Sequence, residues 1–384
     1  MGSWSANAVS LPQQAAAGGG TWVQLPRQHG ICSVPLRREP GLASGASQPR
    51  QPVVIASLGS GVWRVGNGLI DIDVSAAGLL ALRDRDGREQ LSAPLRLKRY
   101  RDRGEFWDAW DLAADYRSHP LGVMSMDVVE WLDQGPLVAH LVLRRQLGAS
   151  CMRLDLRLKA DRPWLELICS VDWCQTHELL RLDLPLAPPA VRIAADTSGG
   201  VIERPAEPMT AREQARWEVP VISWFASQSP APGGGIAVLM DGPQGVDWSS
   251  DRLGISLLRG PTWPDPSADQ GWHRQRLALM PFSGSWSDAG VPQAAIAFRE
   301  PGWCAALPAE LRQWFPSLPL QLMPVALERH VDACLLKLLN AGSARCCWTP
   351  GAGWSVRRQA DSDASDAVMI APGELVSLVV DQSS

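Results

Sequence analysis

The sequence predicts an all-β fold, and three observations support this prediction. Apolar and polar residues alternate in several segments after residue 53, such segments recur at short intervals, and only residues 209–217 show helical spacing. Alternation places every second side chain in a core, which is the pattern of a half-buried antiparallel strand. Strands that recur in this way with few helices are typical of a large β-sandwich.

The first segment in chain order, residues 1–52, is rich in Gly, Ala, Ser, Gln and Pro. This composition is typical of a flexible segment that joins other parts of a protein. A short apolar stretch, Thr21–Leu25, is the one part of it that we expect to be ordered against another element.

Residues 53–300 form the large β-domain of the prediction. Alternation is clearest in Leu69–Val74, Met152–Lys159 and Leu180–Leu184, where apolar residues fall on one face. Four later segments are also predicted to be strands: Gly235–Met240, Gly254–Leu258, Arg276–Met280 and Ala294–Phe298.

The segment 301–324 contains five prolines and is predicted to be a linker, because proline cannot donate to a sheet ladder. Beyond it, residues 325–384 are predicted to form a small second β-sandwich. Its expected strands are 331–339, 346–349, 353–357, 367–370 and 374–380.

Composition excludes several classes of function. The chain has 384 residues, 46% of them hydrophobic, and a net charge of −4. A nearly balanced charge argues against a nucleic-acid partner, and the lack of an apolar run of about 18 residues argues against a membrane span. The first 30 residues do not have the pattern of a secretory signal. Eight cysteines without a Cys-x-x-Cys pair fit a cytoplasmic protein with reduced thiols.

The segment 251–286 carries the most polar candidates for a site. A predicted strand ends at Arg259, and a proline-rich loop with Asp265, Asp269 and Gln270 leads to His273. Loops between rigid strands commonly carry functional residues, and Asp and His can act as acid, base or ligand. The alternative is a structured loop in which the aspartates only cap turns.

Two pairs of residues in the sequence give weak support for a metal site. Asp269 and His273 would share a face only on a helix, which Pro264, Pro266 and Gly271 make unfavourable. His330 and Asp332 would share a face of a strand, but a structural zinc needs four ligands and no others are nearby in the sequence. We therefore predict no metal and no cofactor in this chain.

The segment Glu105–Asp111 combines three carboxylates with two tryptophans, Trp107 and Trp110. Two carboxylates on either side of a sugar bond are the requirement for glycoside hydrolysis. Spacing in the sequence does not establish such a pair. The favoured interpretation is a turn held by buried indoles, because large aromatic side chains dominate protein cores.

Several of these segments resemble the C-terminal half of glycoside hydrolase family 38, the retaining α-mannosidases. The strongest match is 257–273, LLRGPTWPDPSADQGWH, which is similar to the family signature LLRSPTxPDPxADQGxH with Gly260 where Ser is usual. Residues 108–111 resemble the family's Asp-Ala-Trp-Asp turn. Weaker likenesses lie in 201–205, 215–220, 235–239 and 333–340.

The resemblance implies a large galactose-mutarotase-like supersandwich followed by a small β-sandwich domain. It also implies an α-mannoside as carbohydrate partner. In the family, the aspartate nucleophile and a zinc ion belong to an N-terminal β/α barrel. The segment before residue 53 has no room for a barrel of about 250 residues. We therefore expect no catalytic residue in this chain, which is either a truncated or split product or the partner of a separate catalytic barrel chain.

The resemblance further implies which residues line the sugar site: Arg259, Asp269, Gln270 and His273 through polar groups, and Trp263 and Trp272 through their apolar faces. Most of the other tryptophans, among the 18 in the chain, are expected in the cores. The predicted function is the carbohydrate-binding, scaffolding part of an α-mannosidase. The alternatives are a free-standing carbohydrate-binding module and a non-functional gene remnant.

Overall fold

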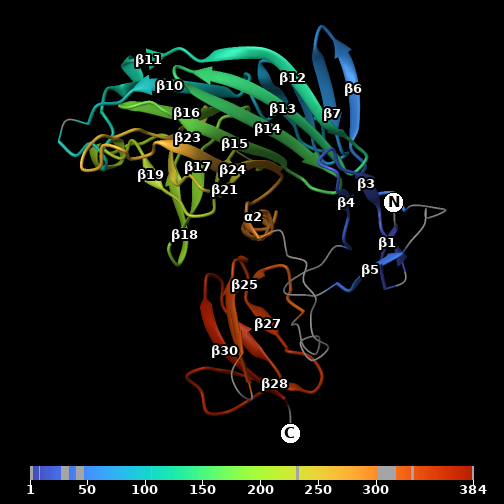
Figure 1. The fold of residues 1–384 in the computed structure, drawn as a ribbon. Helices are drawn as coiled ribbons and strands as arrows, with labels where there is room; N and C mark the ends of the chain where they lie inside the picture. The colour runs from blue at the N-terminus through green and yellow to red at the C-terminus, as the bar shows by residue number, and fades with distance from the viewer. Residues whose placement is uncertain are drawn as a thin grey trace.

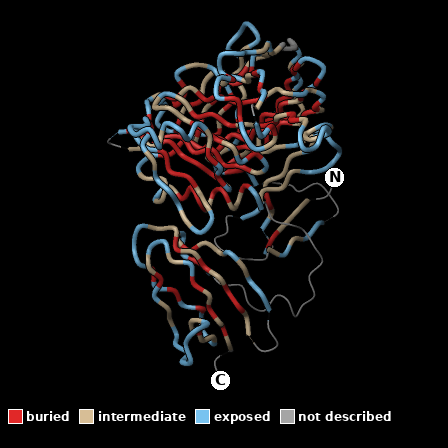
Figure 2. Tube along the Cα trace, turned by 90° about the vertical axis from the view of Figure 1, so that its left-hand side faces the viewer, coloured by how far each residue is buried: buried red, intermediate tan, exposed pale blue. Residues whose placement is uncertain are grey.

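The computed structural model describes residues 3–7, 9–26, 34–39, 47–104, 106–230, 233–300, 317–329 and 333–382. Within this part the chain forms a large β-sandwich and a smaller β-domain below it in Figure 1. Figure 2 shows buried residues concentrated in two separate regions, one in each domain. The predicted all-β fold class is confirmed.

A nine-stranded antiparallel sheet is the larger layer of the sandwich. In order across the sheet its strands are β12 (Met124–Gln134), β13 (Val138–Leu147), β14 (Ser150–Lys159), β15 (Leu165–Trp173), β24 (Gly271–Phe282), β21 (Gly235–Asp241), β20 (Trp224–Gln228), β17 (Arg192–Thr197) and β18 (Gly200–Pro205). The predicted alternation over 152–159 lies within β14, where the even-numbered leucines face the core.

Two smaller sheets form the opposite layer. One has the order β11 (Pro120–Leu121), β10 (Arg96–Arg101), β16 (Glu178–Pro185), β23 (Arg252–Leu258), β22 (Gly245–Ser249) and β19 (Val219–Pro220). The other has the order β6 (Val54–Gly59), β7 (Val62–Gly66), β8 (Asp71–Ser75) and β9 (Gly78–Arg83).

The main core lies between these layers. Leu182 of β16, Leu156 of β14 and Ile72 of β8 are each at most 2% exposed and belong to one hydrophobic cluster. Burial of this apolar surface is the main force that holds the layers together.

A helix covers the outer face of the nine-stranded sheet, and it corrects one prediction. The segment 294–298 was expected to be a strand, but it lies in helix α2 (Val291–Arg299). Val291, Ala294, Ala295 and Phe298 are buried at helical spacing against a second cluster that includes Trp224. Proline near the start of the helix fits its first turn.

The one segment predicted to be helical, 209–217, contains a short helix, α1 (Ala211–Gln214). Thr210 and Glu213 cap its N-terminus reciprocally, since the Thr210 side chain accepts from the Glu213 amide and the Glu213 carboxylate accepts from the Thr210 amide.

The smaller domain contains a four-stranded sheet and a two-stranded sheet. Their strands are β25 (Leu322–Arg329), β26 (Ala333–Asn340), β30 (Leu375–Gln382) and β28 (Trp354–Arg358), and β27 (Cys346–Trp348) with β29 (Val368–Ile370). Residues 301–316 of the predicted linker lie outside the described residues, and residues 322–324 belong to β25.

The N-terminal segment differs from the predicted flexible chain. Its described residues form β1 (Ser3–Ala6), β2 (Val9–Ser10), β3 (Gln13–Ala15), β4 (Thr21–Val23) and β5 (Leu36–Glu39). The β3–β4 hairpin is fixed because the Gln14 carboxamide donates to the Val138 carbonyl and accepts from the amides of Leu137 and Val138. A glutamine side chain that replaces a peptide partner leaves no periodic signal in the sequence.

Two further findings concern membrane spans and cysteines in the described residues. Across the described ranges, no helix is long and apolar enough to cross a membrane. The six cysteines in these ranges, which exclude Cys32 and Cys304, are all free thiols.

Candidate functional site

Three loops meet at one end of the large sandwich. They join β10 to β11 (residues 102–119), β15 to β16 (174–177) and β23 to β24 (259–270). The first and third, cyan and orange, lie together at the left of Figure 1. They meet because β10, β16 and β23 are neighbours in one sheet, so their ends lie side by side.

The β10–β11 loop is anchored by a small apolar cluster of its own. Tyr116 lies in a short 3-10 helix, η1 (Tyr116–Ser118), and its ring packs edge-on against Tyr100 of β10 with centroids 5.2 Å apart. Leu112, Ala113 and Leu179 complete this buried cluster. The loop is therefore attached to the outer face of the six-stranded sheet.

Arg259 joins the first and third loops through its guanidinium group. Nε donates to Oδ2 of Asp102 over 2.6 Å, and Nη2 donates to the Asp111 carbonyl over 2.7 Å. Nη1 also donates to the Ala109 carbonyl, at 3.4 Å. Asp102 is 2% exposed, so this ion pair is shielded from solvent and holds the loops together more strongly than a surface pair does.

Asp108 makes a second connection between the same loops. Its Oδ2 accepts from the backbone amides of Thr262 at 2.7 Å and Trp263 at 3.3 Å. Burial alone would raise the pKa of Asp108, but these hydrogen bonds and the nearby charges of His177 and Arg259 lower it overall. The carboxylate is therefore held in its ionised form, as an acceptor.

His177 completes this connection from the β15–β16 loop. Its Nε2 lies 3.2 Å from Oγ1 of Thr262, and its Nδ1 lies 3.6 Å from Oδ1 of Asp108. The backbone amide of His177 donates to the Gly260 carbonyl over 2.7 Å. All three loops are thus linked through one histidine.

Gly260, the departure from the family signature, lies where two loops approach most closely. A Cβ at this position would be 2.2 Å from the carbonyl oxygen of Gln175. The geometry of this chain therefore requires glycine where the signature has serine.

Three of the four predicted polar residues, Arg259, Asp269 and Gln270, lie in the β23–β24 loop, and His273 lies at the start of β24. Oδ2 of Asp269 accepts from the Arg259 amide at 3.2 Å, and Gln270 Nε2 donates to the Gln175 carbonyl over 2.8 Å. His273 Nε2 lies 2.8 Å from the Asp269 carbonyl. Asp269 adopts a left-handed φ of 60°, as Asp does in tight turns.

The two predicted tryptophans are exposed, and two others join them. Trp263 is 49% and Trp272 75% exposed. Trp107 and Trp110 are 57% and 67% exposed, so the interpretation of a turn held by buried indoles is wrong. The turn itself exists, since the amides of Trp110 and Asp111 donate to the Trp107 carbonyl, but the buried residue that holds it is Asp108.

Trp107, Trp110 and Trp263 form one group, which we call the tryptophan cluster. Their ring centroids are 5.5–6.1 Å apart, and Trp110 contacts the other two in an edge-on geometry. The neighbouring Phe106 is 81% exposed. Contiguous exposed aromatic side chains of this size are typical of surfaces that bind something.

Sequence reasoning missed Asp102 and His177 as parts of this site. Neither lies in a recognisable motif, and each acts through contacts with residues more than 80 positions away. The match of residues 108–111 to the family turn indicated their neighbour Asp108, but it did not indicate Asp102 or His177.

The described residues show no metal centre. They contain no group of three or more His, Cys, Asp or Glu side chains that could hold a metal ion. His273 contacts the backbone carbonyl of Asp269 and not its carboxylate, from the start of strand β24. His330 and Asp332 lie outside the described residues.

Comparisons with known proteins identify the family to which the chain belongs. A model of the glycosyl hydrolases family 38 C-terminal domain matches residues 65–267. Alpha-mannosidase 2C1 of Homo sapiens is 29% identical over 311 residues, which cover 78% of this chain and 29% of that protein. Alpha-mannosidase G of Dictyostelium discoideum is 27% identical over 191 residues, covering 48% of this chain and 17% of that protein.

A solved structure of an alpha-mannosidase from Enterococcus faecalis V583 has the same fold. It aligns with a TM-score of 0.66 at 12% identity, over 90% of this chain and 44% of that one. The match to the human relative covers under a third of the length of that protein. Because the family model covers more than half of its residues, the chain belongs to glycosyl hydrolases family 38, through the C-terminal domain of that family.

Proposed function

We propose that this chain is the carbohydrate-binding and scaffolding C-terminal part of an α-mannosidase. In this proposal it frames an α-mannoside together with a catalytic β/α barrel supplied by a separate chain. Family membership and the assembled loop of residues 259–273 support the proposal.

One observation carries the proposal: the signature loop is fixed by polar contacts beneath it, while its indoles remain exposed. Arg259, Asp269, Gln270 and His273 set the loop's shape through the contacts described above. Trp263 and Trp272 are left to meet the apolar face of a sugar ring. Sugar hydroxyls would use the exposed parts of the Asp269 and Gln270 side chains.

The first test is turnover of 4-nitrophenyl α-mannoside. We expect negligible hydrolysis by the pure chain, and hydrolysis when it is mixed with the barrel half of a family 38 α-mannosidase. Hydrolysis that exceeds the rate of that barrel half alone supports the scaffolding role. Robust turnover by the pure chain, or no gain on mixing, contradicts it.

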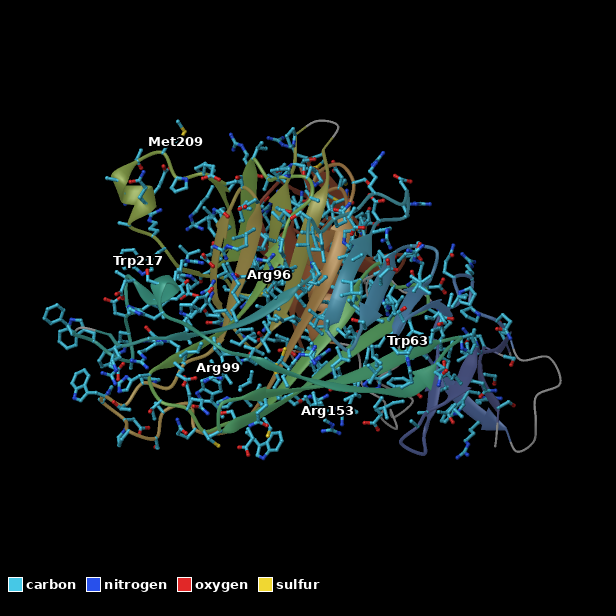
Figure 3. The ribbon with its side chains drawn as sticks, turned by 90° about the horizontal axis from the view of Figure 1, so that it is seen from above. Trp63, Arg96, Arg99, Arg153, Met209 and Trp217 are labelled. Carbon is cyan, nitrogen blue, oxygen red and sulfur yellow. The ribbon has the colours of Figure 1, made fainter. Side chains whose placement is uncertain are left out.

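The second test examines the site residues in the same mixture. His273→Ala and Asp269→Ala are each expected to lower kcat/KM at least tenfold, because the loop loses its shape at the sugar. Arg153→Ala is a suitable control, because Arg153 lies on the outer face of β14 and its guanidinium group pairs with Asp155. Figure 3 shows its position. If both site variants kept full activity, the framing role of the loop would be wrong.

A second candidate function is a free-standing carbohydrate-binding module, which the exposed tryptophans favour. Such a module would bind mannosides by itself and would show no association with a barrel chain. Analytical ultracentrifugation of the mixture separates the two functions, because only the scaffolding part is expected to associate with the barrel chain.

A further inference from the structure

The tryptophan cluster extends well beyond the residues that the signature marks. Trp107 and Trp110 come from the β10–β11 loop and meet Trp263 from the β23–β24 loop. Trp272 lies on β24, where it pairs with Asp172 of β15. Among the described residues, no ring contact connects Trp272 with the cluster. The cluster therefore comprises Trp107, Trp110 and Trp263 without Trp272.

The geometry of the rings leaves part of their faces available. The planes of Trp107 and Trp110 are inclined by 66°, those of Trp110 and Trp263 by 77°, and those of Trp107 and Trp263 by 45°. Two rings stacked in parallel each cover a face of the other, whereas in an edge-on contact the edge of one ring meets only one face of its partner. This agrees with exposed fractions of 49–67% for the three side chains.

The cluster is also held firmly before any ligand arrives. Asp108 lies between Trp107 and Ala109 in the chain and accepts from the Trp263 amide, so one buried carboxylate fixes both loops. Arg259 donates to the carbonyls on either side of Trp110, those of Ala109 and Asp111. A preorganised surface loses little conformational entropy on binding.

Exposed carboxylates close to the tryptophans in the chain fit a hydroxyl-rich ligand. Asp111 follows Trp110 directly, and Asp265 lies two residues after Trp263. Hydrogen bonds from the Ser267 amide and hydroxyl lower the pKa of Asp265, so its carboxylate is ionised and accepts hydrogen bonds. A pyranose ring combines an apolar C–H face for an indole with hydroxyl donors for such carboxylates.

From these observations we propose that the tryptophan cluster is a carbohydrate-binding platform, in which Trp107 and Trp110 stack against a pyranose ring. The proposal rests on the proposed function only in taking an α-mannoside as the sugar. It gives Trp107 and Trp110 a role in binding, and it needs no catalytic partner.

The test is titration of the pure chain with an α-linked mannotriose, followed by tryptophan fluorescence and by ligand-observed NMR. The double variant Trp107→Ala/Trp110→Ala is expected to bind at least tenfold more weakly than the unchanged chain. Trp217→Ala is the matched control: this indole is 45% exposed, lies after α1 as Figure 3 shows, and is not among the rings that contact one another in the cluster. It should bind normally.

A second double variant, Trp107→Phe/Trp110→Phe, guards against loss of folding. It keeps aromatic faces at both positions and is expected to lose no more than about threefold in affinity, since a smaller ring still stacks. Circular dichroism of both double variants should match that of the unchanged chain.

The outcomes separate this proposal from the proposed function. Unchanged mannotriose binding by the alanine variant overturns the platform, even if the mixed enzyme is active. No binding by the unchanged chain, together with protection of the cluster's fluorescence by the barrel half, also overturns it and identifies a protein-docking surface. Sugar binding that needs Trp107 and Trp110 supports the platform, even if mixing restores no hydrolysis.

Discussion

Two groups of tryptophans on the large sandwich differ in what surrounds them. On the outer face of the nine-stranded sheet, Trp224 is 2% exposed beneath α2, and the ring of Trp286 lies 5.1 Å from it. In the tryptophan cluster, Trp110 is 67% exposed. The first group is held by apolar burial and the second by the charged residues Asp108 and Arg259. Tryptophan thus stabilises the fold in one place and remains available for binding in the other.

Truncation of one indole from each group tests this difference between the two groups most directly. Trp224→Ala leaves a cavity beneath α2 and is expected to lower the free energy of unfolding by about 3–5 kcal/mol. Trp110→Ala removes a mostly exposed side chain and is expected to change it by no more than about 0.5 kcal/mol. Urea unfolding followed by far-ultraviolet circular dichroism measures both, and equal losses would contradict the distinction.

The next largest effect is expected at Gly260, which allows the loops below the cluster to approach. In Gly260→Ser the new Cβ would lie 2.2 Å from the Gln175 carbonyl oxygen, so the backbone must move. We expect a loss of about 1–3 kcal/mol, the usual cost of overpacking. Gly200→Ser is a control for the loss of a glycine, because a Cβ at Gly200 would meet nothing within 4 Å and its φ lies outside the left-handed region.

The readout specific to the comparison is fluorescence. Gly260→Ser should shift the emission of the tryptophan cluster while leaving the buried Trp224 group unchanged. If the variant is as stable as the original chain and its emission is unaltered, the close approach at Gly260 does not hold the loops.

The smallest expected effect is that of acid. The pKa of Asp108 lies below its ordinary value of 3.8, so its contribution to stability is complete above that value and is lost as the pH falls below it. Protonation weakens the acceptor for the Thr262 and Trp263 amides. Fluorescence of the cluster should therefore change below about pH 4, before the whole domain unfolds.

Asp108→Asn provides the control for this titration, because its side chain cannot ionise. The variant should lack the fluorescence change that the unchanged chain shows below pH 4. A transition of the same size in both proteins would assign the acid effect to other carboxylates, such as Asp155, whose pKa is lowered to about 2.

The sequence was most informative about strands that have one buried and one polar face. The alternation of 152–159 and 180–184 predicted β14 and β16, because period two leaves a direct record of burial. The apolar run 294–298 carried no such record and was predicted to be a strand. Only the spacing of Val291 with the later residues shows the helical face that packs on the sheet.

The candidate site was predictable only in part. The signature loop indicated Arg259 and Trp263, but the contacts of Asp102 and His177 depend on how loops distant in sequence meet in space. Aromatic residues are usually buried, so the exposure of Trp107 and Trp110 contradicted a sound general expectation. Exposure here results from buried charges that hold the turn, which composition does not reveal.

The contact between Arg259 and Asp102 also has a consequence for the time course of folding. It joins residues 157 positions apart, and the contact between Asp108 and Thr262 joins residues 154 apart. Contacts this distant in sequence require most of the intervening strands to be paired first, so they form late. The emission of the exposed indoles during refolding is therefore expected to change in a late phase, when the two layers of the large sandwich have come together.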